Sequence, residues 1–552
     1  IHKELQRFMS NSSARKSTLN RKKPCRWSEH KLYTMNENIA DLVEQFYLPF
    51  GGKLNPENRW VQLSKLIPWD KVEQKYVEAF KSPIRGKTAY SVRVALGSLI
   101  IKERLGLSDR ETTLQIAENP YLQFFIGYSE FVDKEPFHHS LMTHFRDRLG
   151  PDILLEINEW IISEAIKAEA SQTAEPDQNS DDDDPDNGQI AMEVGNELTL
   201  PEDLPPRRPK RKTKQAPFKA VPLDTDVEPP THKGKLMLDA TCAPADIKYP
   251  TDLGLLNHAR EITEDIIDTL HEPHIGLKKK PRTYRNQARK TYLYVAKQRK
   301  WSGKTMRKAV RKQLSYVRRN LKTIEKQMFD TPLTVLSHRQ YRRLLVIQEL
   351  YRQQWEMYQQ KQHRIEDRIV SIDQPHVRPI VRGKAGAQVE FGAKIAASLI
   401  DGYVHIEYMQ WDNFNEAKTL QASVESFKQR FGYYPEAVLA DKLYRNRENR
   451  RYCQERGIRL SGPKLGRPPK EGRKADLKQE RQDAAERNQI EGKFGEGKRK
   501  FGLDRIRARL ANTSETVIAV QFIVMNLERR LRFLFFLLVT WFRNRNLHLV
   551  QC

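Results

Sequence analysis

Three acidic residues stand where a carboxylate is costly unless it has a partner. Asp239 is alone in an apolar strand pattern, Asp441 ends a second one, and Glu491 follows on a predicted helix. Carboxylates among apolar residues lose free energy unless they are paired or bind a cation. Grouped together they could hold Mg²⁺, which prefers oxygen ligands and keeps positions open for phosphate oxygens. Two such ions, ~3.5–4 Å apart, would clamp the attacking and leaving oxygens of a phosphoryl displacement.

Each acid also has a plainer structural interpretation: taken alone, Asp239 could cap a helix or pair with an arginine. Other patterns in the sequence resemble binding motifs only weakly. The run from Gly492 to Lys498 matches most of a phosphate loop, but Arg499 stands where Ser or Thr must reach Mg²⁺. A tetra-Asp run is predicted to be a solvated charge run. The histidines near 140 lack the partners of a zinc site: His138, His139 and His144.

The elements that would position the acids alternate between strand and helix. They predict an α/β domain with a mixed sheet over 232–532, interrupted by a helical insertion at about 257–372 that packs as a hairpin of two or three long helices. The expected elements are a strand from 235, a β-hairpin around Asp401-Gly402, a helix before 432, a strand ending at Asp441, a helix at 446–456, a strand at 457–460, a helix at 475–500 and an apolar helix at 516–532.

An all-α domain is predicted ahead of this sheet, over 31–168. Residues 90–107 carry apolar residues at helical spacing, and Ser108-x-x-Glu111 reads as a capping box for a helix that Pro120 helps to end. A further helix ends at Gly150. These helices fit either a helix-turn-helix, with His144, Arg146 and Arg148 on its last helix, or an ordinary helical bundle.

Composition divides the rest of the chain. Residues 1–30 form a basic flexible tail, 169–231 an acidic then basic disordered linker, and 533–552 an apolar and basic C-terminal tail. The longest apolar run, 533–542, is far short of the ~20 residues of a membrane helix. Four scattered cysteines exclude a disulfide framework and indicate a reducing cytoplasm.

Positive charge dominates the chain and predicts a polyanionic partner. Lys and Arg number 96 against 71 Asp and Glu, a net charge of +25. Between Lys278 and Lys322 there are 18 basic residues and no acid, which favours a phosphate-binding face. Its first cations are Lys278, Lys279, Lys280 and Arg282. Arg467 lies in a Gly-Arg-Pro run that resembles a minor-groove hook, although a plain surface loop is the alternative.

Three blocks of the sequence resemble the catalytic blocks of bacterial insertion-sequence transposases of the DDE type, in the insertion-sequence-five group. They are KLMLDATCAPADIKYPTD, AVLADKLYRNRENRRYCQERGIRLSGPKLGRPPK and ERNQIEGKFGEGKRKFGLDRIRARL. The third has the family's helical signature, Arg487, three residues, Glu491, six residues and Lys498. The segment at about 35–150 resembles the group's N-terminal helical domain. One departure is Ala484, where the wider signature has Tyr, which puts a single phosphate contact in doubt.

The resemblance implies a ribonuclease-H-like core in which Asp239, Asp441 and Glu491 are the metal ligands. It implies two Mg²⁺ ions, with Mn²⁺ able to substitute because it favours the same oxygen ligands. It also implies that Arg487 and Lys498 contact DNA phosphates near the cleavage site.

We therefore expect a DNA transposase that binds the double-stranded terminal inverted repeats of its element, hydrolyses phosphodiester bonds and transfers strands into target DNA. At least a homodimer is needed to join two ends, and we expect a cytoplasmic, nucleoid-associated bacterial protein with no membrane contact. The alternatives are a catalytically silent, transposase-derived DNA-binding protein and a structural RNA-binding module. The second leaves the three acids unexplained.

Overall fold

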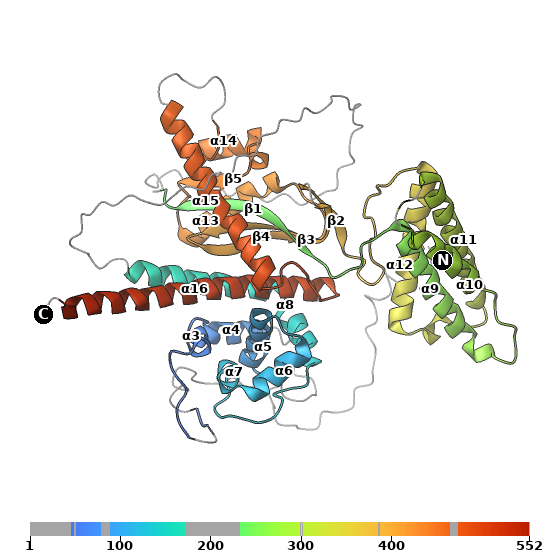
Figure 1. The fold of residues 1–552 in the computed structure, drawn as a ribbon, viewed down its shortest axis with the longest axis horizontal. Helices are drawn as coiled ribbons and strands as arrows, with labels where there is room; N and C mark the ends of the chain where they lie inside the picture. Colours follow the sequence, from blue (N-terminus) through green and yellow to red (C-terminus); the bar gives the residue numbers. More distant parts are fainter. Residues whose placement is uncertain are drawn as a thin grey trace, which may run out of the picture.

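The computed structural model describes residues 46–48, 51–78, 89–172, 232–298, 300, 302–384, 387–463 and 473–550. Figure 1 shows three parts in these residues: an N-terminal group of helices, a mixed sheet with its covering helices, and a separate bundle of helices to one side. The predicted tail at 1–30, the linker beyond residue 172 and Arg467 lie outside the described residues.

The N-terminal helices begin and end largely where the sequence predicts. Ser91 caps the helix at 92–105, Gly106 ends it in the left-handed conformation, and the Ser108 side chain accepts from the Glu111 amide. Pro120 ends one helix and also begins the next, where its missing N–H costs nothing. The helices are α3 (Arg59–Lys65), α4 (Trp69–Glu78), α5 (Val92–Leu105), α6 (Asp109–Glu118), α7 (Pro120–Phe125) and α8 (Leu141–Gln172), the last kinked at Gly150.

A mixed six-stranded sheet follows. Its strands are β1 (Lys235–Pro244), β2 (Arg378–Lys384), β3 (Ala387–Ile400), β4 (Tyr403–Gln410), β5 (Ala437–Ala440) and β6 (Arg459–Leu460). The order is β2-β3-β1-β5-β6, and β4 also pairs with β3. Strands β1, β5 and β6 are parallel, whereas β3 is antiparallel to β1, β2 and β4.

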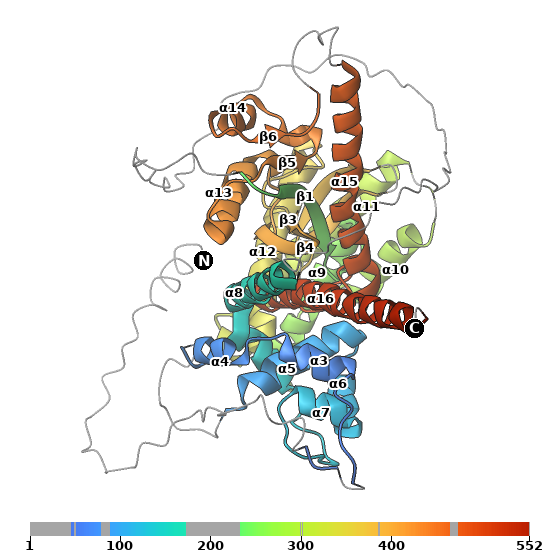
Figure 2. The ribbon, with the colours of Figure 1, turned by 90° about the vertical axis from the view of Figure 1, so that its left-hand side faces the viewer.

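The predicted hairpin is confirmed, with positive φ at both Asp401 (49°) and Gly402 (82°), as a tight two-residue turn requires. Strand β2 was not predicted, because a proline and two arginines interrupt its short apolar pattern. Helices α13 (Leu420–Phe431) and α14 (Arg447–Glu455) cover one face of the sheet, and α15 (Arg473–Lys500) packs on the other. Figure 2 shows α15 beside β1 and β5.

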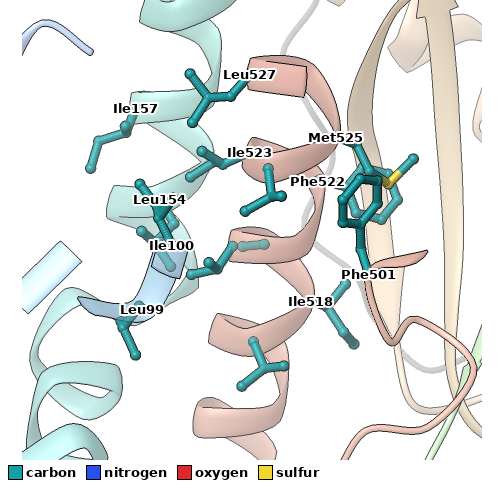
Figure 3. Packing of buried hydrophobic residues seen from close by; sticks show 14 of the residues in the cluster. Leu99, Ile100, Leu154, Ile157, Phe501, Ile518, Phe522, Ile523, Met525 and Leu527 are labelled. Atoms are coloured by element: carbon teal, nitrogen blue, oxygen red, sulfur yellow. The ribbon is translucent and has the colours of Figure 1, made fainter. Parts of the chain in front are cut away.

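Helix α16 (Ala511–Val550) joins the N-terminal helices to the sheet. Ile518, Phe522 and Ile523 pack in one core with α5, α8 and the sheet, as Figure 3 shows. The prediction of a helix over 516–532 was too short, and the predicted C-terminal tail is helical as far as Val550. The apolar run at 533–542 contains no Gly or Pro, so nothing in it stops the helix.

The insertion is a bundle of four helices in the described residues, rather than the two or three predicted. They are α9 (Asp252–His271), α10 (Arg285–Ala296), α11 (Gly303–Gln327) and α12 (His338–Gln360). Asn320 and Gln327 donate to the carbonyls of Arg260 and Ile267, so α9 and α11 run parallel. Gln354 donates to Asp252 and Arg307 to the Tyr358 carbonyl, so the end of α12 lies beside the starts of α9 and α11 and α12 is antiparallel to both. The insertion begins at Asp252, five residues before the predicted boundary.

Candidate active site

The alternation of strand residues places two of the acids on one face of the sheet. In β1, Leu236 and Leu238 face α13 and α14, while Met237 belongs to the core on the α15 side. Asp239 is two residues after Met237 in the same strand, so it lies on the same face of the sheet, toward α15. Asp441 comes directly after β5, in which Leu439 also faces the α15 side. Because Leu238 pairs with Ala440 in the parallel register, Asp239 and Asp441 follow side by side.

Helix α15 brings the third acid over the same face. Ile490 and Phe494 are buried against the sheet and α16, which fixes the rotation of the helix. Arg487, Glu491 and Lys498 recur at helical spacing and therefore share a face. In this structure the Arg487 guanidinium lies 3.3 Å from the Glu491 carboxylate.

A cleft of about 720 Å³ collects these groups. All three predicted acids line it, together with the two cations predicted to contact phosphate, Arg487 and Lys498. Its remaining charged side chains are Lys394 and Glu416. Five of the predicted site residues, which come from three separate elements, therefore meet in one place.

Burial in the cleft perturbs the Asp239 carboxyl. Burial raises the pKa of the Asp239 carboxyl to about 6, against a hydrogen bond from the Ala240 amide, and the charges of Glu416 and Glu491 raise it further. Because the Asp239 carboxylate is costly to ionise beside other carboxylates, a cation that enters the cleft would stabilise its charged form. The Asp441 carboxylate accepts from the Lys442 amide at 2.7 Å, so it also caps a short turn.

Glu416 and Lys394 were missed from the sequence. The Lys394 ammonium is almost fully buried, lies 2.8 Å from the Glu416 carboxylate and donates to the Phe414 carbonyl at 2.8 Å. A lysine in the otherwise apolar strand KIAASLI is as anomalous as Asp239 in β1, so the same argument applied to cations would have found it. Glu416 begins a short 3-10 helix, Glu416–Lys418, in a polar loop, and the sequence gave no such signal there.

The oxygen donors of this cleft suit a hard divalent cation. Asp239, Asp441 and Glu491 are carboxylates, the ligands that such ions prefer, whereas Cys242, which also lines the cleft, is fully buried. As the side chains stand, the described part of the chain contains no group of three Asp, Glu, His or Cys residues close enough to hold one ion. Binding would draw the three carboxylates closer than they lie here.

The predicted cations at the start of the insertion lie in the loop between α9 and α10 and do not line the cleft. Lys278 pairs with Asp330 and Lys280 with Asp268, each at 2.8 Å, while Arg282 stacks over Tyr284 at 4.6 Å. Lys279 is exposed. Such exposed ion pairs are weak, so a phosphate can replace the acid partner.

A stronger basic surface runs along α11, which we call the α11 stripe. Its buried side includes Leu314, Val317 and Ile324. The opposite side is exposed and carries cations at successive helical turns: Lys304, Arg307, Lys308, Arg311, Lys312, Arg318, Arg319 and Lys322. At 1.5 Å per residue, this stripe is about 27 Å long.

In the N-terminal helices, two of the basic residues considered for a helix-turn-helix are used for packing. Arg146 is buried and makes a two-pronged contact with Asp109, at 3.0 and 2.6 Å. Arg148 donates to the Tyr76 hydroxyl at 3.1 Å. Their contacts favour the bundle interpretation for these side chains.

Comparison with known proteins finds transposase domains in two parts of the chain. The family model described as a transposase DDE domain matches residues 438–528, which include Asp441, Arg487, Glu491 and Lys498. A second model, described as a transposase domain (DUF772), matches residues 49–148. The resemblance to the DDE transposases of insertion sequences is thereby confirmed for both the N-terminal helices and the later part of the sheet domain.

Among curated proteins, uncharacterized protein ORF8 in the nfe locus of Rhizobium meliloti is 33% identical over 124 residues. The match covers 22% of this chain and 58% of the relative, so the chain spans little more than half of that protein's length. No solved structure matches. In the described residues, no helix is long and apolar enough to cross a membrane.

Proposed function

We propose that the chain is a DNA transposase that binds the terminal inverted repeats of an insertion sequence, cuts phosphodiester bonds there and joins the freed strands to target DNA. The observation that carries the proposal is the meeting of Asp239, Asp441 and Glu491 with Arg487 and Lys498 in one cleft. The parallel strands β1 and β5, extended by an antiparallel hairpin, support a ribonuclease-H-like assignment for the sheet.

In this proposal Asp239, Asp441 and Glu491 hold two Mg²⁺ ions, and Mn²⁺ can replace them. When bound, such ions would supply Lewis-acid activation of the attacking water or 3′-hydroxyl and would stabilise charge on the leaving oxygen. Arg487 exchanges its contact with Glu491 for a DNA phosphate, which frees the carboxylate as a ligand. Lys498, on the same face of α15, holds a second phosphate oxygen.

DNA outside the cleft would be held by phosphate contacts. The α11 stripe and the cations at 278–282 give the insertion a positive surface with few acids, which suits a duplex backbone. Arg467 remains a proposed minor-groove contact. Joining two ends would require a homodimer or a larger assembly.

The test is cleavage of a labelled duplex that carries one end of the genetic element encoding the chain, in Mg²⁺, Mn²⁺ or EDTA. Nicking at the end is expected for the wild type with either metal and is lost in EDTA. Asp441→Asn should abolish it, because the substitution removes a charged ligand but keeps the shape. Asp133→Asn, at an exposed position outside the cleft, is the matched control and should cut normally. Undiminished cutting by Asp441→Asn would refute the assignment.

The second candidate is a catalytically silent DNA-binding protein derived from a transposase. Two observations favour it: in this structure the acids do not lie close enough to hold an ion, and Glu491 is paired with Arg487. It predicts binding to the same duplex without cutting in either metal.

A further inference from the structure

Two large apolar side chains are exposed on the wall of the acid cleft. Leu443 is 64% exposed and Val381 is 56% exposed, and both line the cavity that contains the three acids. Single exposed apolar residues are common on protein surfaces. Leu443 and Val381, however, lie together in one charged cleft, beside the acids. A substrate that offers an apolar face to these two side chains would remove them from water.

The position of Leu443 is set by a rigid turn. The Asp441 carboxylate accepts from the Lys442 amide, and the Tyr444 ring is fully buried in the core under α13 and α14. Arg445 then donates to the carbonyls of Leu460, the last residue of β6, and of Ser461, which follows it. With both neighbours fixed, Leu443 is held in the cleft rather than folded back onto the protein.

Val381 approaches from β2. In that strand Ile380 is buried while Val381, the next residue along, is exposed, as the alternation of a strand requires. Val381 pairs with Val389 of β3, so its backbone is part of the sheet. The apolar contacts therefore come from two different elements, each with a fixed backbone.

We infer that Leu443 is a wedge that packs against an unstacked base next to the scissile phosphate, and that Val381 contacts the adjoining sugar or base. The inference rests on the proposed function. The carboxylates and Arg487 account for the phosphate, but the nucleoside beside it needs apolar contact. In a stacked duplex only the edges of a base are accessible, whereas an unstacked base offers its flat face, and aliphatic wedges between base steps are a known way to kink DNA.

The experiment uses the full chain and the same element-end duplex, with 2-aminopurine placed beside the cleavage position and Ca²⁺ in place of Mg²⁺ to prevent cutting. Binding of the wild type should raise the fluorescence, because 2-aminopurine brightens when it unstacks. Leu443→Ala should bind with an affinity within about twofold of wild type, because phosphate contacts dominate affinity. Its fluorescence rise should be lost, and its cutting rate in Mg²⁺ should fall about tenfold, the equivalent of ~1.4 kcal/mol of lost apolar contact.

Two further variants isolate the wedge. Leu443→Met keeps the volume and should restore both signals, whereas Leu277→Ala removes an 81%-exposed leucine from the insertion and should change neither. A Leu443→Ala protein that unstacks and cuts like the wild type would overturn the inference. If Leu443→Ala changes only self-association, the surface contacts a second copy and the inference is also wrong. Failure of the wild type to cut in either metal refutes the proposed function instead.

Discussion

Replacing Asn526 should uncouple α16 from the sheet. The Asn526 side chain is fully buried, accepts from the Val404 amide at 2.9 Å and donates to the Val404 carbonyl at 2.8 Å. It also donates to Asn158 of α8 at 2.9 Å. The side-chain amide of Asn526 thus pairs with the N–H and the carbonyl of Val404 in β4 and links that strand to the N-terminal helices.

Asn526→Leu keeps the approximate size of the side chain but removes all three hydrogen bonds. The Val404 amide and the Asn158 carbonyl oxygen are left buried without these partners, while the Val404 carbonyl keeps a long contact with Asn158 at 3.5 Å. A buried polar group without a partner costs about 1–3 kcal/mol. Two such groups, less the gain from apolar leucine, predict a loss of about 3 kcal/mol.

Hydrogen exchange measured by mass spectrometry on the β4 peptide gives the local opening free energy without assuming two-state unfolding of the whole chain. Exchange at β4 should accelerate by about 100-fold in Asn526→Leu, the equivalent of ~3 kcal/mol. Asn512→Leu is the control, since Asn512 is exposed on the same helix and its side-chain amide donates to Asp147 at 3.3 Å, away from β4. A change below fivefold at β4 would show that this amide does not hold the two parts together.

Three other predictions follow from single residues. Burial, and to a smaller extent the nearby arginines, lowers the pKa of His376 to about 4, so the folded protein favours the neutral ring. The stability that this ring contributes is complete above about pH 6.5, the pKa of histidine in the unfolded chain, and is lost as the pH falls toward 4. Because the ring is only half-buried, solvent screening limits this loss to about 1 kcal/mol, and urea midpoints at pH 7 and pH 5 should converge in His376→Gln. Lys312→Gln, on the α11 stripe, should make the logarithmic salt dependence of DNA affinity less steep by about one, whereas Arg352→Gln, already paired with glutamates on α12, should not. Gly392→Ala would place its Cβ 2.0 Å from the Ala243 carbonyl oxygen and should lower the thermal midpoint sharply by separating β1 from β3, whereas Gly303→Ala meets no atom within 4 Å and should be neutral or stabilising.

Local patterns in the sequence determined the elements of the site and, with the resemblance, its residues. The apolar period of 235–244 predicted β1 within the observed bounds, and the helical signature placed Arg487, Glu491 and Lys498 on one face. Asp-Gly chemistry predicted the hairpin turn. These features depend on neighbours a few residues apart, so the sequence contains them directly.

The structure alone decided which distant residues complete the site. Glu416, Leu443 and Val381 line the cleft because a loop, a capped turn and an unpredicted strand converge there, and no local pattern encodes that meeting. The length of α16 and the fourth helix of the insertion were also missed. The apolar faces of these helices are buried only by contact with distant parts of the chain. The stability of a helix in a folded protein comes mainly from that tertiary packing.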